Sequence, residues 1–184
     1  GKAEVLKMMP GLSPRIHSAV LYYDGQLDDA RYCLALIRSA TEAGAVPANH
    51  LEVCGFQKNA GGKICAATIN DRAETRRPPF QIRAKRFLNC TGPYADHIRQ
   101  LANPDLPGRI SPSKGVHVIL PLSLLDSEKA MLIPKTSDGR VIFAIPFEGK
   151  LLVGTTDEPF RSLTEEPLLE SREVDFLLSE LQPF

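Results

Sequence analysis

The second half of the chain contains four short β-prone runs, and the short gaps between them constrain the fold most strongly. Two of the gaps, "SDGR" at 137–140 and "FEGK" at 147–150, carry Asp-Gly and Glu-Gly pairs that are typical of tight turns. Strands joined by such turns pair antiparallel, because a parallel crossover needs a dozen or more residues. We therefore predict a mainly antiparallel sheet over 114–156, built from "KGVHVILP", "AMLIP", "RVIFAIPF" and "KLLVGTT".

The first half mixes helical and strand-like segments. Asp28 is a good N-cap for "DARYCLALIRSATEAG", whose apolar residues repeat at helical spacing and which ends at Gly44. A short helix is expected before Pro10, another from about Tyr94 to Leu101, and a closing helix over "SREVDFLLSEL" with an apolar face formed by Val174, Leu177, Leu178 and Leu181. Strands are expected at 16–24, 51–56, 63–69 and 80–91.

The predicted fold class is therefore α+β (α/β), with two interwoven parts. Residues 1–113 form a layered part of helices and short strands, and residues 114–184 form the antiparallel sheet with its closing helix. If the sheet's first strand begins at Gly115, His117 and Ile119 lie on one face, and Val118 lies on the other.

Composition excludes several classes of function. Lys plus Arg and Asp plus Glu are 22 each, so no net positive charge attracts nucleic acid. The four cysteines and four histidines show neither C-x-x-C nor the spacing of metal ligands, so we predict no metal site and a reducing compartment. The sequence also lacks G-x-G-x-x-G, a Walker loop, H-E-x-x-H and G-x-S-x-G.

Local features remain that are ordinary when each is taken alone. "CTGP" at 90–93 is typical of a turn, Lys114 of a solvated lysine, and His117 of a core histidine satisfied by a neighbour. "VGTTD" at 153–157 is equally compatible with a strand end. In their order along the chain, however, "LYYDGQLDDAR", "NCTGPYAD", "KGVHVILP" and "SDGRVIFAIPFEGKLLVGTTD" resemble the FAD-dependent glycerol-3-phosphate dehydrogenases, from about Ser18 to Asp157.

This resemblance implies a FAD-binding domain interwoven with a substrate-binding sheet, as in the D-amino-acid oxidase group. It implies that Val53, Thr91 and Gly92 approach FAD, with Gly92 leaving room for the cofactor. It also implies that His117 acts near the substrate hydroxyl, where a neutral imidazole can accept a proton. Lys114 and Thr155 would bind the substrate through positive charge and a hydroxyl hydrogen bond.

The resemblance further implies that the chain is an internal piece of the catalytic region. The glycine-rich FAD loop is expected before Gly1, and an arginine that binds the substrate phosphate is expected after Phe184. Alone, the chain is then expected neither to bind FAD tightly nor to turn over substrate, because a diphosphate needs free backbone N–H groups at a helix start.

The expected reaction is oxidation of sn-glycerol 3-phosphate to dihydroxyacetone phosphate, with electrons passed to a quinone. The expected location is the cytoplasm, in peripheral contact with the inner membrane, and a homodimer is possible. Three alternatives stay open: an oxygen-reducing glycerol-phosphate oxidase, an amine oxidase of the same fold, and a non-catalytic interaction module. Peroxide formation would mark the first, and an exposed apolar patch would mark the last.

Overall fold

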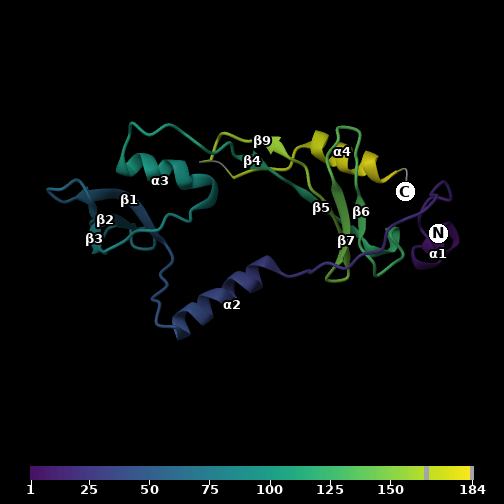
Figure 1. The fold of residues 1–184 in the computed structure, drawn as a ribbon, viewed down its shortest axis with the longest axis horizontal. Coiled ribbons are helices and arrows are strands. Elements are labelled where there is room, and N and C mark those ends of the chain that lie inside the picture. The colour runs from purple at the N-terminus through teal and green to yellow at the C-terminus, as the bar shows by residue number, and fades with distance from the viewer. Residues whose placement is uncertain (164–165, 183–184) are drawn as a thin grey trace. The chain divides into compact units, whose positions relative to one another are not determined.

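A computed structural model describes residues 1–163 and 166–182 of the chain (Figure 1). The chain divides into two compact units, and each is described by itself. Unit 1 combines Gly1–Tyr22 with Ser111–Phe184, and unit 2 is Tyr23–Ile110. The boundary that the sequence suggested at residue 113 concerns domains of a whole enzyme and stays a prediction.

Unit 1 is built on an antiparallel sheet of four strands in the order β5-β8-β7-β6, so the prediction for 114–156 is confirmed. The strands are β5 (His117–Pro121), β6 (Met131–Ile133), β7 (Ile142–Phe147) and β8 (Lys150–Gly154). Gly139 and Gly149 adopt φ of +87° and +75°, the left-handed conformation for which glycine is best suited in such turns. A separate two-stranded pair is formed by β4 (Ser113–Lys114), which precedes β5 along the chain, and β9 (Glu158–Pro159), which follows β8.

One face of this sheet carries the core of unit 1. Helix α4 (Ser171–Leu181) and helix α1 (Lys2–Met8) contribute to it (Figure 1). A short 3-10 turn, η2 (Leu122–Leu124), follows β5. The fully buried side chains include Ile133, Ile142, Val153 and Leu177. As the strand parity predicted, Val118 packs on this core whereas His117 and Ile119 lie on the opposite, exposed face.

Unit 2 contains a three-stranded antiparallel sheet in the order β1-β2-β3. Its elements are α2 (Asp29–Glu42), β1 (Leu51–Lys58), β2 (Ile64–Asp71), β3 (Phe80–Arg83), the 3-10 turn η1 (Gly92–Tyr94) and α3 (Ala95–Ala102). The cap predicted for α2 is present, because the Asp28 side chain accepts a hydrogen bond of 2.9 Å from Arg31 N. Every residue of α2 is exposed.

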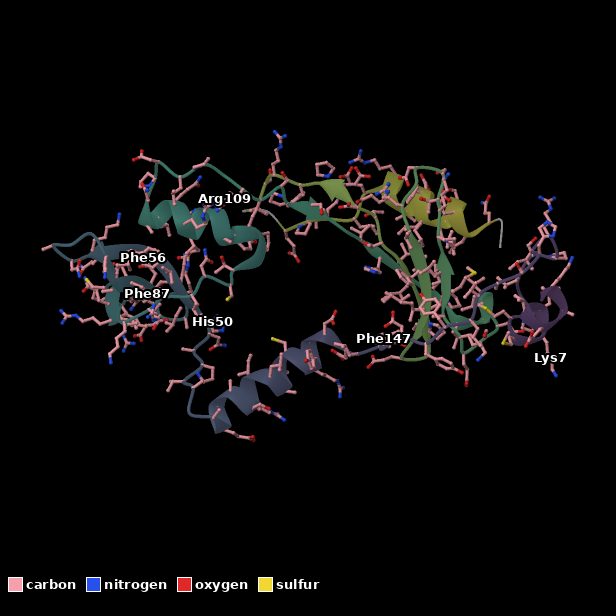
Figure 2. All side chains as sticks on the ribbon, in the orientation of Figure 1. Lys7, His50, Phe56, Phe87, Arg109 and Phe147 are labelled. Atoms are coloured by element: carbon pink, nitrogen blue, oxygen red, sulfur yellow. The ribbon has the colours of Figure 1, made fainter. Side chains whose placement is uncertain are left out.

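Two strand predictions were wrong. Residues 16–24 form no strand, and the strand expected over 80–91 ends at Arg83. Phe87 instead packs edge-to-face on Phe56 of β1, with ring centroids 5.9 Å apart (Figure 2). Both segments have the composition of strands, but β propensity is realised only where a neighbouring strand offers backbone partners.

Replacing Leu177 by alanine tests the core of unit 1. The side chain is fully buried against the sheet, so its removal leaves a cavity and should cost about 2–5 kcal/mol in the free energy of unfolding, measured with denaturant. Leu178→Ala is the matched control. Leu178 is the next residue in α4 and is 38% exposed, so its replacement should reduce the free energy of unfolding clearly less. Equal losses for the two variants would contradict this packing.

Candidate active site on the uncovered face of the sheet

His117 begins strand β5 and lies directly over Gly154 of β8, its partner in the antiparallel register. A Cβ atom added at Gly154 would lie 2.7 Å from His117 Cγ and 2.9 Å from Nε2, and it would also collide with Cδ2. Because real Cβ contacts are longer than this, only glycine leaves room for the imidazole in its present position. The sheet therefore leaves room for the ring over Gly154, a feature that the sequence did not predict.

The sheet face around His117 is apolar, and among the described residues of unit 1 no other element covers it. Phe143 of β7 pairs with Gly154 from the other side, so it and His117 flank the same glycine. Ile119 is 69% exposed, and Phe143 is 38% exposed. An imidazole on a flat apolar face can take up a proton from a group placed against that face.

Thr155 follows β8 directly and is half-buried. Its hydroxyl donates a 2.9 Å hydrogen bond to the Thr156 carbonyl oxygen. A Cβ atom added at Gly115 would come within 2.5 Å of Thr155 Oγ1, so a second glycine makes room for a side chain here. In this arrangement the hydroxyl's hydrogen is already donated, which leaves its oxygen lone pairs to accept a bond from a substrate.

Lys114 is 6% exposed and lies in β4, so it is not the solvated lysine that its local sequence suggested. Its Nζ donates to Glu173 Oε2 at 2.8 Å, to Leu168 O at 2.9 Å and to Glu170 Oε1 at 3.2 Å. An ammonium group has three hydrogens, and all three are donated. Direct binding of a substrate phosphate, as the resemblance implied, would require one of these bonds to be exchanged.

Glu173 is 2% exposed, and its carboxylate is charged in spite of its burial. Burial opposes the charge most strongly, but hydrogen bonds from Lys114, Glu170 N and Thr156, together with the positive charge of Lys114, outweigh it and hold the pKa of Glu173 below its ordinary 4.5. The hydrogen bond to Glu173 in turn raises the pKa of Lys114 above its ordinary 10.5. The pair is therefore ionised throughout the neutral range.

This ion pair predicts a pH dependence of stability. A carboxyl group with a lowered folded-state pKa stabilises the fold above its unfolded pKa of 4.5, and that contribution is lost as the pH falls through the folded value. The raised pKa of Lys114 contributes stability that is complete below pH 10.5. That contribution is lost as the pH rises through the folded value. Glu173→Gln should lower the unfolding temperature at pH 7. On acidification from about pH 5 to about pH 3, a range around the ordinary pKa of a glutamate, the unfolding temperature of the variant should fall less than that of the parent. Parallel losses in the two proteins would contradict the ion pair.

The residues expected near FAD lie in unit 2. Val53 is half-buried on β1, next to a bulge between Val53 and Gly55. Thr91 is exposed, and its hydroxyl donates to Asn89 Oδ1 at 2.8 Å. Gly92 has φ +54°, and a Cβ atom there would meet nothing within 4 Å. Its backbone conformation alone therefore favours glycine, and the collision with a cofactor that the sequence suggested is untested.

These features fit part of a flavin dinucleotide. The surface at Thr91 and Gly92 is uncrowded and carries a hydroxyl group, and the face at His117 offers a flat ring system an apolar contact. The sequence contains no G-x-G-x-x-G turn to hold a diphosphate. Each of these two surfaces, taken by itself, fits part of such a group, and the sequence carries no G-x-G-x-x-G cradle for the diphosphate.

An apolar cavity of about 250 Å³ occurs in unit 1, but it lies on the core side of the sheet. Leu120, Met131 and Leu151 line it together with residues of α4, and these strand residues project away from the face that carries His117. It is therefore a packing feature of the core and not the site described above.

The whole chain, residues 1–184, matches the family of FAD dependent oxidoreductases, so this protein belongs to that family. A probable mitochondrial glycerol-3-phosphate dehydrogenase of Dictyostelium discoideum is 39% identical, over 99% of this chain and 29% of its own length. The human mitochondrial glycerol-3-phosphate dehydrogenase is 34% identical, over 100% of this chain and 26% of its own length. The chain thus spans between a quarter and a third of these relatives.

Among solved structures, the glycerol-3-phosphate dehydrogenase from Bacillus halodurans complexed with FAD is similar, with a TM-score of 0.89 and 30% identity. The match covers 98% of this chain and 36% of that one. The predicted class of fold is therefore confirmed, as is the resemblance on which the sequence analysis relied. Within the described residues, every helix is too short or too polar to cross a membrane.

Proposed function

We propose that this chain is part of the catalytic region of a FAD-dependent enzyme that oxidises sn-glycerol 3-phosphate to dihydroxyacetone phosphate. The observation that carries the proposal is the imidazole of His117, held over Gly154 on an uncovered apolar sheet face. The two relatives described above and the Bacillus halodurans structure, all glycerol-3-phosphate dehydrogenases by name, support the choice of substrate.

Oxidation of a secondary alcohol removes one proton from the hydroxyl oxygen and one hydrogen with two electrons from the carbinol carbon, and a C=O bond forms. His117 would accept the hydroxyl proton on its imidazole. When bound, FAD would supply the oxidising power by accepting the two electrons and the hydrogen from carbon. The apolar face around His117 is exposed, so water would leave it only when the cofactor and the substrate cover it.

The other residues have binding roles in this proposal. Val53, Thr91 and Gly92 would contact FAD from unit 2. Thr155 would accept a hydrogen bond from the substrate, because its own hydrogen is donated to Thr156 O. Lys114 would contribute positive charge, in direct contact only if it exchanges one of its three hydrogen bonds.

The acceptor, the location and the assembly belong to the same proposal. We expect a quinone to reoxidise the flavin, peripheral contact with the inner membrane from the cytoplasmic side, and a homodimer. Oxygen as acceptor would instead make the protein a glycerol-phosphate oxidase and would release hydrogen peroxide.

The test is anaerobic reduction of the flavin in the whole protein, followed by its visible absorbance. Glycerol 3-phosphate should bleach the flavin and yield an equal amount of dihydroxyacetone phosphate, whereas sarcosine should leave it oxidised. A quinone analogue should then restore the absorbance without peroxide. Bleaching by sarcosine alone would identify an amine oxidase, and a protein that holds no flavin would favour an interaction module.

A further inference from the structure

Thr156, one residue beyond the predicted Thr155, is almost completely buried at 1% exposure and forms two hydrogen bonds with Val116, the residue before His117, and one with Glu173. Its Oγ1 accepts a bond of 3.1 Å from Val116 N and donates one of 3.2 Å to Glu173 Oε1. Its own N–H donates to Val116 O at 3.3 Å. Thr156 therefore connects the backbone just before His117 to helix α4.

The segment before His117 is fixed from two sides by the same carboxylate. Glu173 Oε1 accepts from Thr156, which holds Val116, and Glu173 Oε2 accepts from Lys114. Gly115, between these two anchored residues, lies so close to Thr155 that a side chain would not fit. Residues 114–116 are thus held at three successive positions, and His117 is the next residue.

A buried ion pair is a weak source of stability compared with apolar side chains of the same volume. Its distinctive effect is geometric, because charged hydrogen bonds fix directions as well as distances. β4 and β9 each have only two residues, so backbone pairing alone holds this segment weakly. The network supplies the fixed geometry that the short strands lack.

We propose that Thr156 and Glu173 are positioning residues that hold His117 against its substrate through the backbone of 114–116. This inference rests on the proposed function of His117. A displacement of about 1 Å at a reacting group can cost about 10²-fold in rate, so a hydrogen bond one residue away is enough to affect turnover.

The test compares Thr156→Val, which removes the hydroxyl at nearly constant volume, with Thr156→Ser, which retains it. In the whole protein, Thr156→Val should lower the rate of flavin reduction about 10- to 100-fold with little change in substrate KM, and Thr156→Ser should restore most of it. Thr136→Val is the control for loss of a buried threonine hydroxyl: Thr136 bonds Asp138 and Arg140 O in the turn before β7, and not the backbone of 114–116. This control should keep the parent rate.

A second readout does not depend on activity. Hydrogen–deuterium exchange of the protein stripped of flavin should accelerate in the peptide that covers 114–120 for Thr156→Val and Glu173→Gln, and not for Thr156→Ser or Thr136→Val. Parent-like exchange and rate in Thr156→Val would overturn the inference. Should Thr156→Val not fold, Glu173→Gln decides by the same two readouts. If glycerol 3-phosphate reduces no flavin in the parent, the proposed function fails, while the exchange result still decides whether this network holds the segment.

Discussion

Replacing His117 by alanine is expected to lower the rate of flavin reduction by glycerol 3-phosphate about 10²–10⁴-fold, the usual cost of removing a general base. Stability should change little, because the side chain lies on the exposed face of the sheet and contributes nothing to the core. The measurement is anaerobic stopped-flow absorbance of the whole protein at saturating substrate, together with its unfolding temperature.

The matched control for this variant is His97→Ala. His97 is also exposed, but it lies in α3 of unit 2 and has no assigned role. It should keep the parent rate. A His117→Ala protein that retains its rate within about threefold, far less than the cost of losing a general base, would return His117 to the ordinary role of a surface histidine.

Gly154→Ala should cost about 10²-fold in the same rate although it adds only a methyl group. The new Cβ would lie 2.7 Å from His117 Cγ, and the ring cannot avoid it without rotating away from its present place. Gly55→Ala is the control within a strand, because its Cβ would meet the Thr68 side chain at an ordinary 3.9 Å. It should fold and turn over like the parent.

A double variant separates displacement of the imidazole from general damage to the sheet. If Gly154→Ala acts by moving His117, it should have almost no further effect on rate in a protein that already carries His117→Ala. Independent, multiplicative losses would show that Gly154 matters for another reason.

The sheet of unit 1 was predictable because its information is local. Turns with Gly139 and Gly149 set the hairpins, and alternation of side chains along β5 placed Ile119 on the opposite face from Val118. The segments at 16–24 and 84–91 were not predictable in the same way, because their composition says nothing about whether a partner strand lies beside them.

In the candidate site too, features set by local sequence were predictable, and features set by contacts between distant residues were not. His117 was identified by its motif, but the closeness of Gly154 depends on how β5 and β8 pair, and they are separated along the chain by β6 and β7. Glu173 lies outside the apolar face predicted for α4, and its burial against Lys114, 59 residues earlier, has no local signal. The one available hint was that an acidic residue adjoined the apolar face of α4.

The central claim is that the imidazole of His117 takes the hydroxyl proton, and the most direct measurement is chemical rescue. The His117→Ala protein, loaded with flavin and saturated with glycerol 3-phosphate under anaerobic conditions, is mixed with increasing concentrations of free imidazole. If His117 is the base, flavin reduction should accelerate with imidazole in the variant and remain unchanged in the parent. Reduction in the variant that is as fast as in the parent before any imidazole is added would contradict the claim.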